Sequence, residues 1–140
     1  MAQVLFRSVV PRSASDLFDW HCRPGAFGRL VPPGQPVRLQ GCDLGLAPGD
    51  RRTLKIGYGP LSQTWVADHD EWVSGRQFRD VQSKGPFRRW EHTHRCLPAM
   101  SELERESECA VLEDQVEFDL LGLPKWALRL GLGSTMADMF

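Results

Sequence analysis

The side chains best suited to chemistry lie in two neighbouring extended segments joined by a Gly-Pro turn. They alternate along the chain: Phe78, Asp80 and Gln82 in the first segment, then Trp90, His92, His94 and Cys96 in the second. Because residues two apart share one face of a strand, both sets are expected to project from one side of a β-hairpin. That face combines aromatic rings with a carboxylate, an amide and two imidazoles. Polar groups on an otherwise apolar face are typical of a ligand-binding cavity.

Three roles are open for Asp80, His92 and His94. The first is a structural network, since buried polar groups need partners and an unmade hydrogen bond costs about 1–3 kcal/mol. The second is direct contact with a bound ligand. The third is an acid/base pair of Asp80 with His92, which would move a proton next to a carbonyl group. Because structural ion pairs often mimic active sites, we assign no catalytic residue and keep Asp80 and His92 as candidates.

A metal site is a less favoured interpretation of the same residues. His92 and His94 form a His-x-His motif that offers two nitrogens to zinc, and Cys96 or Asp80 could supply a third ligand. Stable zinc sites use three or four well-placed ligands, and the sequence contains no second cluster of such residues. We therefore expect no metal and no other cofactor.

A long alternating segment, 108–121, adds residues to the predicted cavity. One face carries mainly apolar side chains, and the other carries acidic and amide side chains, which indicates a sheet with one solvated side. The inward face holds Leu112, Asp114, Val116, Phe118 and Leu120. We expect Asp114 to join the polar group, and Val116 and Phe118 to join Trp126 of a C-terminal helix in an apolar wall.

The elements that must position these residues follow from apolar periodicity and from Gly and Pro residues. The pattern predicts strands over 3–10, 37–42, 51–57, 61–73, 76–82, 87–96 and 108–121. Short helices are predicted over 14–20 and 25–30, and a final helix begins at Pro124. Strands segregated from helices indicate an α+β domain, with a curved antiparallel sheet of six to seven strands wrapped around the C-terminal helix.

Two features of the 61–73 strand depend on its register. Trp65 and Trp72 are seven residues apart, so they face opposite sides unless a β-bulge intervenes. His69 is flanked by acidic residues, and we expect it to be solvated at a charged strand end.

Composition restricts the class of protein. The chain has 140 residues, of which 41% are hydrophobic and 25% charged, as in a single globular domain. Its net charge of −1 does not favour nucleic-acid binding, and no apolar run approaches the roughly 20 residues of a membrane span. The N-terminus lacks the pattern of a signal peptide, and no cysteines have C-x-x-C spacing. We therefore expect a cytoplasmic protein with free thiols.

The whole pattern resembles the SRPBCC superfamily, whose members have the START-like or Bet v 1-like helix-grip fold. The resemblance rests on Phe78, Asp80, Gln82, Gly85-Pro86-Phe87, Trp90, His92 and His94. Weaker matches are Gly59-Pro60 with Trp65, Leu112-x-Asp114-x-Val116, and Arg23-Pro24 followed by Pro32-Pro33. The likeness is nearest to bacterial polyketide cyclase/dehydrase-like ligand-binding members, some of which are fused to a nucleotide-sugar epimerase-like domain.

This resemblance implies a single domain over 1–140 with a cavity between the sheet and the C-terminal helix. The closing helix, 123–140, is shorter than is usual in the superfamily. Two explanations are open for its apolar end: a partner subunit that covers it, as in a homodimer, or the loss of a longer tail.

The predicted function is the binding of a small hydrophobic molecule, aromatic, polyketide-like or lipid-like, in that cavity. The polar end of the ligand would be oriented by Asp80, Gln82, His92, His94 and Asp114. The apolar walls would be Phe78, Trp90, Val116, Phe118 and Trp126. Two alternatives stay open: a cofactor-free cyclase or dehydratase that uses Asp80 and His92, and a protein-interaction module without a ligand.

Overall fold

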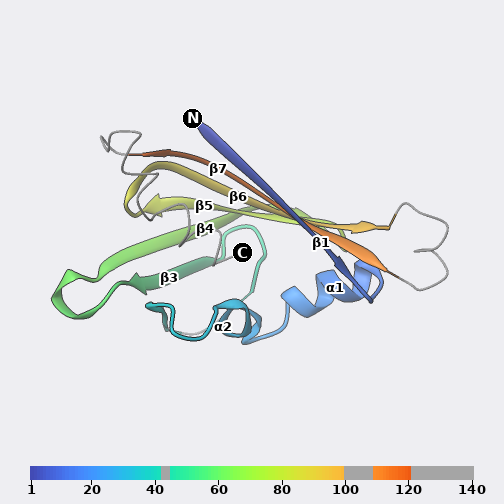
Figure 1. The fold of residues 1–140 in the computed structure, drawn as a ribbon, viewed down its shortest axis with the longest axis horizontal. Helices are drawn as coiled ribbons and strands as arrows, with labels where there is room; N and C mark the ends of the chain where they lie inside the picture. The colour runs from blue at the N-terminus through green and yellow to red at the C-terminus, as the bar shows by residue number, and fades with distance from the viewer. Residues whose placement is uncertain (42–44, 100–108, 121–140) are drawn as a thin grey trace.

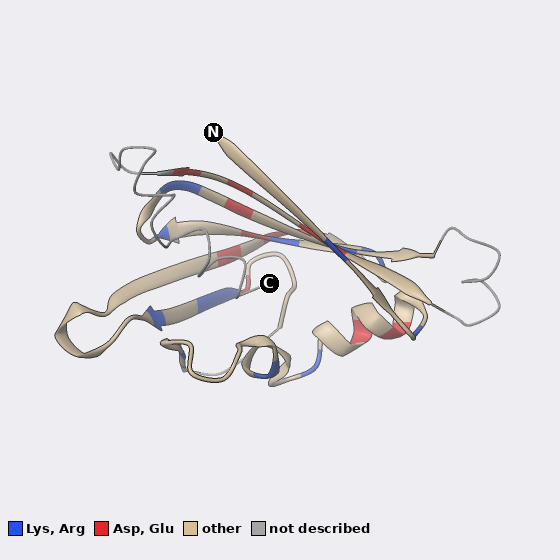
Figure 2. Cartoon of the chain, in the orientation of Figure 1, with Lys and Arg blue, Asp and Glu red and all other residues tan. Residues whose placement is uncertain are grey.

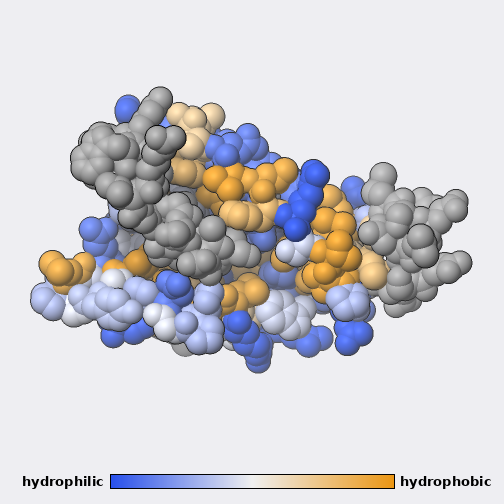
Figure 3. All heavy atoms as spheres, in the orientation of Figure 1, coloured by the Kyte–Doolittle hydropathy of each residue, from blue (hydrophilic) through white to orange (hydrophobic). Residues whose placement is uncertain are grey.

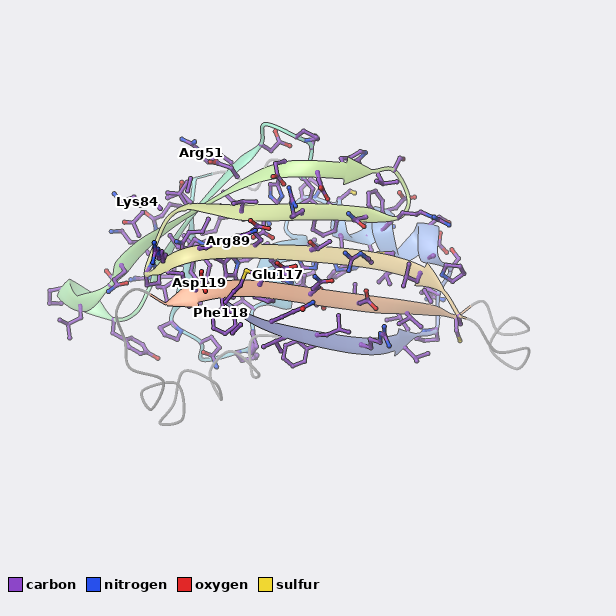
Figure 4. All side chains as sticks on the ribbon, turned by 90° about the horizontal axis from the view of Figure 1, so that it is seen from above. Arg51, Lys84, Arg89, Glu117, Phe118 and Asp119 are labelled. Carbon is purple, nitrogen blue, oxygen red and sulfur yellow. The ribbon has the colours of Figure 1, made fainter. Side chains whose placement is uncertain are left out.

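One antiparallel sheet of seven strands dominates the computed structural model of the chain, which describes residues 1–41, 45–99 and 109–120 (Figure 1). The strands are β1 (Ala2–Val10), β2 (Val37–Gln40), β3 (Arg51–Ile56), β4 (Gln63–Val73), β5 (Gln77–Lys84), β6 (Phe87–Pro98) and β7 (Ala110–Leu120). Their order across the sheet is β1-β7-β6-β5-β4-β3-β2, and Figure 4 shows β4 to β7 and β1 side by side. The predicted antiparallel sheet is therefore confirmed.

Two short helices lie on one face of this sheet, below it in Figure 1. They are α1 (Ala14–His21) and α2 (Ala26–Leu30), and a single 3₁₀ turn, η1 (Gly59–Leu61), joins β3 to β4. The Ser13 hydroxyl caps α1 by accepting a hydrogen bond from the backbone N–H of Asp16 at 3.1 Å. Within the described ranges, no helix has the length and apolar character needed to cross a bilayer.

The predicted C-terminal helix, including Trp126, lies outside the described residues. The sheet and the two helices that follow β1 are thus confirmed, whereas the packing of a closing helix in the concave face stays a prediction.

A β-bulge in β4 decides which of its side chains face inward. His69 pairs with Asp80 of β5 and Glu71 pairs with Arg79, so Asp70 is one extra residue between two successive pairs. This extra residue brings Trp72 to the same side as Trp65, since Trp65 lies in the core and Trp72 packs against Phe18 at 4.8 Å between ring centroids. The bulge therefore resolves the question that the seven-residue spacing left open.

Polar side chains separate two buried apolar clusters on the inner face of the sheet. The first cluster is built around Trp65, Phe87, Trp90, Val116 and Phe118. The second contains Leu17 and Phe18 of α1 with Phe78, Cys96 and Ala110 of the sheet. Along β6, the residues between Trp90 and Cys96 include His92 and His94, so the imidazoles lie between the two clusters.

The face of the sheet that points away from the helices carries ion pairs between neighbouring strands, and Figure 2 shows positions of both charge signs interspersed along those strands. Arginines pair with carboxylates across neighbouring strands, as in Arg51–Asp68 at 2.5 Å and Arg95–Glu113 at 3.0 Å. In β7, Phe118 is only 5% exposed, while its labelled neighbours in Figure 4, Glu117 and Asp119, are partly exposed. This alternation confirms the predicted two-sided character of the strand.

Candidate functional site

A cavity of about 200 Å³ lies between the inner face of the sheet and the α1–α2 segment. One part of its wall is apolar and comes from α2 and strands β3, β4 and β6: Phe27, Leu30, Leu54, Ile56, Trp65 and Trp90. The other part is ionisable, with His21, His69, Asp80, His92, His94 and Asp114. Arg52 also lines the cavity, and its guanidinium carbon lies 5.0 Å from the centroid of the Phe27 ring.

All four histidines of the chain line this cavity. His21, His69 and His92 are each 6% exposed or less, which is unusual for a side chain that can carry a charge. Their convergence on one site comes from three different elements: α1, β4 and β6.

The register of the sheet explains how the polar side chains meet. His69, Asp80 and His92 are directly opposite one another on β4, β5 and β6. In the adjacent row, His94 lies between Phe78 of β5 and Asp114 of β7. Directly opposite side chains on one face are the closest neighbours in an antiparallel sheet, so two cross-strand rows build the site.

The shortest contact in the site joins His94 to Asp114. His94 Nδ1 lies 2.6 Å from Asp114 Oδ1, and the Phe78 ring stacks on the His94 ring with centroids 4.4 Å apart. Burial opposes the charged form of His94, but the carboxylates of Asp114 and Asp80 outweigh it and raise the pKa of His94 to about 9. His94 is therefore an imidazolium at neutral pH.

Both carboxylates stay ionised beside this imidazolium. Burial alone would raise the pKa of Asp114 and of Asp80, but contacts with the imidazoles lower both below their usual values. The site therefore combines two negative charges with one positive charge on His94.

His92 lies between the two carboxylates and at similar distances from both. Its Nδ1 is 3.7 Å from Asp80 Oδ1, and its Nε2 is 3.5 Å from Asp114 Oδ1. Burial, followed by the positive charge of His94, lowers the pKa of His92, so this imidazole is neutral at pH 7. As an acid/base pair, Asp80 and His92 are thus less closely coupled than Asp114 and His94.

His21 contributes an acceptor from the end of α1. Its Nδ1 lies 2.8 Å from the carbonyl oxygen of Leu17, and a carbonyl only accepts, so Nδ1 carries the hydrogen. Nε2 then holds a lone pair, and it is buried without a hydrogen-bond partner among the described residues. Burial lowers the pKa of His21, which keeps the ring neutral.

Six of the residues predicted as ligand contacts line the cavity: Phe78, Asp80, Trp90, His92, His94 and Asp114. Val116 and Phe118 lie instead in the first core cluster. Gln82 is placed at the turn of the β5–β6 hairpin, where its Nε2 donates to the carbonyl of Phe87 at 2.7 Å. Trp126 lies outside the described residues.

Sequence reasoning missed two histidines of the site. The solvated position expected for His69 is wrong, since this residue is 3% exposed. The sequence did contain evidence for an inward position: His69 is four residues after Trp65, and this spacing places both side chains on one face of a strand. The acidic residues on either side of His69 led to the opposite interpretation. His21 is four residues after Leu17, a spacing that puts both on the buried side of a helix.

One group of side chains has the composition of a metal site. Among the described residues, Asp80, His92 and His94 each offer one ligand atom, and these three atoms lie within 4.8 Å of one another. Cys96, the other third ligand considered from the sequence, is fully buried in the second apolar cluster instead.

Comparison with solved structures identifies the fold. A START superfamily protein from Mycobacterium smegmatis superimposes with a TM-score of 0.67 at 14% identity, over 98% of this chain and 90% of that chain. The chain has the START-like fold. No protein-family model and no curated protein sequence matches it significantly.

Two further structures of this fold are informative. Norcoclaurine synthase from Thalictrum flavum, solved in complex with dopamine and hydroxybenzaldehyde, has a TM-score of 0.63 at 14% identity and covers 99% of this chain and 83% of that chain. A nucleoside-diphosphate sugar epimerase from Corynebacterium glutamicum has a TM-score of 0.63 at 24% identity. The START-like chain aligns over 97% of its own length and with 28% of the epimerase chain.

Proposed function

We propose that this START-like domain binds a small molecule with one aromatic or similarly compact apolar group in the cavity beneath the sheet. The observation that carries this proposal is a cavity of about 200 Å³ with an aromatic wall on one part and ionisable side chains on another. An apolar cavity of about 150 Å³ accommodates benzene. The volume therefore suits one ring with short substituents better than a lipid-like or polyketide-like ligand, for which sites of about 300–1,000 Å³ are typical.

Three acceptors in the polar wall, which also contains the donors Arg52 and His94, favour a ligand that donates hydrogen bonds. Asp80 and Asp114 are ionised and only accept, and His21 Nε2 presents a buried lone pair. A hydroxyl or ammonium group on the ligand would satisfy such acceptors. Dopamine and hydroxybenzaldehyde, found with norcoclaurine synthase, are single-ring molecules with hydroxyl groups, and they support a ligand of this size class.

An enzymatic role is the second candidate, and the geometry changes its proposed residues. A cyclase or dehydratase would need a carboxylate that orients an imidazole at hydrogen-bond distance. His94 and Asp114 come closer to that arrangement, as an ion pair at 2.6 Å, whereas Asp80 and His92 are 3.7 Å apart. Turnover, if it occurs, would therefore depend on His94 and Asp114 more than on Asp80 with His92.

The protein-interaction alternative has less support. It requires a filled interior and a contiguous exposed apolar patch. The interior contains the cavity, and the apolar groups visible on the face in Figure 3 are separated by polar residues.

The test is thermal stabilisation of the protein by a matched series of compounds. Tyramine, 4-ethylphenol, ethylbenzene and palmitate vary the donor groups and the size separately. We expect tyramine or 4-ethylphenol to stabilise the protein most, by about 2.7 kcal/mol at a concentration 100 times the dissociation constant. Native mass spectrometry should then show one bound molecule.

A cavity-filling variant is the matched control. Ala67 is buried and lines the cavity, so Ala67→Leu should reduce ligand stabilisation while the protein stays folded. Asp70→Asn changes an exposed residue of β4 and should leave the stabilisation by ligand unchanged. Stabilisation by palmitate alone, or stabilisation by single-ring compounds that Ala67→Leu does not reduce, would contradict the proposal.

A further inference from the structure

We propose that Asp80, His92 and His94 bind a divalent transition-metal cation, with Asp114 holding both imidazoles in position. This inference is independent of the organic ligand, because a cation is bound and measured without one. The sequence argued against a metal, since stable zinc sites use three or four well-placed ligands and the sequence contains no second cluster of such residues. The fold removes that objection by placing β5 and β7 on either side of β6, each with a carboxylate beside the imidazoles.

The three side chains already have nearly the spacing of a coordination site. Asp80 Oδ1 lies 3.7 Å from His92 Nδ1 and 3.8 Å from His94 Nε2. Zinc binds imidazole nitrogen and carboxylate oxygen at about 2.0–2.2 Å in a tetrahedral arrangement, which separates neighbouring ligand atoms by about 3.4 Å. The three ligand atoms lie within 4.8 Å of one another, so modest side-chain shifts would complete the three-ligand set, and the cation would take the place of the proton on His94 Nε2, which is released to solvent.

The remaining nitrogen of each ring faces a second carboxylate. Asp114 Oδ1 lies 2.6 Å from His94 Nδ1 and 3.5 Å from His92 Nε2, which are the nitrogens turned away from Asp80. Histidines that bind metals almost always donate their other ring N–H to a carboxylate, carbonyl or water, which orients the ring. Asp114 Oδ1 lies near both rings, so a small reorientation of its carboxylate would let it accept from the N–H of either imidazole.

The surroundings leave room for further ligands. Asp80, His92, His94 and Asp114 all line the cavity, so a cation held by three of them would present its open positions to the cavity. Two imidazoles and one carboxylate with open positions are typical of zinc or iron(II), and not of magnesium or calcium, which prefer oxygen ligands alone. Such a cation would also accept the oxygen of a bound molecule.

The experiment uses the full chain without a histidine tag, stripped with a chelator and titrated with Zn²⁺ and with Co²⁺. All four histidines line the cavity, so imidazole coordination in this protein can arise only there. We expect one equivalent of Zn²⁺ to bind with micromolar affinity or better. Bound Co²⁺ should show the visible absorption of a four- or five-coordinate site with nitrogen and oxygen ligands.

Variants locate the site. Asp80→Asn and His94→Gln should each weaken Zn²⁺ binding at least tenfold, and Asp114→Asn should weaken it by about 10–100-fold. Asp70→Asn, which alters an exposed carboxylate of β4, is the matched control and should bind as the wild type does. Circular dichroism of each variant checks folding.

Two outcomes would overturn the proposal, and the first needs no variant. One is wild-type protein that binds less than 0.2 equivalents of Zn²⁺ at about 100 μM free ion, or whose Co²⁺ form shows thiolate-to-metal charge transfer and hence cysteine ligands. The other is folded Asp80→Asn and His94→Gln proteins with wild-type affinity.

Discussion

His94 and Asp114 form a buried ion pair across the two longest neighbouring strands of the sheet. They are directly opposite on β6 and β7, and Nδ1 and Oδ1 are 2.6 Å apart. Both side chains have little access to water, because that of His94 is 14% exposed and that of Asp114 is 11% exposed. Several properties of the domain should depend on this contact.

Removal of one partner should destabilise the fold strongly. In Asp114→Ala the His94 imidazolium would be left in a buried site, and we expect the free energy of unfolding to fall by about 3–5 kcal/mol. Urea denaturation measures this change. The double variant Asp114→Ala/His94→Leu should be less destabilised than the sum of the two single variants, and additive effects would show that the pair contributes no coupling.

Gln82 should affect stability and leave ligand binding unchanged. Its Nε2 donates to the Phe87 carbonyl, and its Oε1 accepts from the Phe87 N–H at 3.4 Å, so it closes the β5–β6 turn. Gln82→Ala should lower the free energy of unfolding by about 1–2 kcal/mol through two lost hydrogen bonds. Gln63→Ala, exposed on β4, is the control. A large loss of ligand affinity in Gln82→Ala would instead support the contact that the sequence predicted.

Trp90 should couple core stability to cavity size. Trp90 is 3% exposed and lines the cavity. The centroid of its ring lies 4.9 Å from the ring centroids of Trp65 and of Phe87. Trp90→Ala should cost about 3–5 kcal/mol in unfolding free energy. The enlarged cavity should also shift the preference among ligands towards two-ring compounds, measured by thermal stabilisation with 4-ethylphenol and 2-naphthol. Trp90→Phe, with a smaller loss of volume, should lie between wild type and Trp90→Ala in both assays.

His21 should distinguish ligands that donate a hydrogen bond from those that do not. His21→Phe keeps a ring of similar size and removes the lone pair of Nε2. Because a neutral hydrogen bond contributes about 0.5–1.5 kcal/mol, affinity for 4-ethylphenol should fall about 2–10-fold. Ethylbenzene has no donor and should bind the variant as it binds wild type. Equal losses for both compounds would mean that His21 acts only through packing.

Glu113 should make stability depend on acidic pH. On the outer face it accepts from Arg7 at 2.8 Å and from Arg95 at 3.0 Å. The hydrogen bond from Arg7 lowers the pKa of Glu113, against an opposing effect of burial and with a further contribution from Arg95. A carboxyl with a lowered folded-state pKa stabilises the fold above its unfolded pKa, and this stabilisation is lost as the pH falls through the folded value.

Wild type should therefore exceed Glu113→Gln in unfolding free energy by roughly 0.5–1 kcal/mol at pH 6–7, since the arginines are partly exposed. The difference should shrink progressively below about pH 4.5, and urea denaturation at a series of pH values measures it. Glu117→Gln, on the same face of β7, serves as the control. A difference that is independent of pH would contradict this assignment.

The local features of this protein could be predicted from its sequence. Alternation of side chains has a period of two residues, so it placed Asp80, His92, His94 and Asp114 on inward faces before any pairing was known. The same local rules predicted most strand and helix boundaries to within two residues, and they predicted the hairpin that carries the chemistry.

Only the tertiary structure decided which of these side chains meet. The extra residue Asp70 in β4 reversed the facing of Trp72, and the packing of α1 under the sheet brought His21 to within 6.1 Å of His94, between ring centroids. Register, bulges and helix docking depend on contacts between residues distant in the chain, whose energies a local pattern does not contain. For that reason the sequence indicated a polar inner face, and the fold assembled it into one site with four imidazoles and two carboxylates.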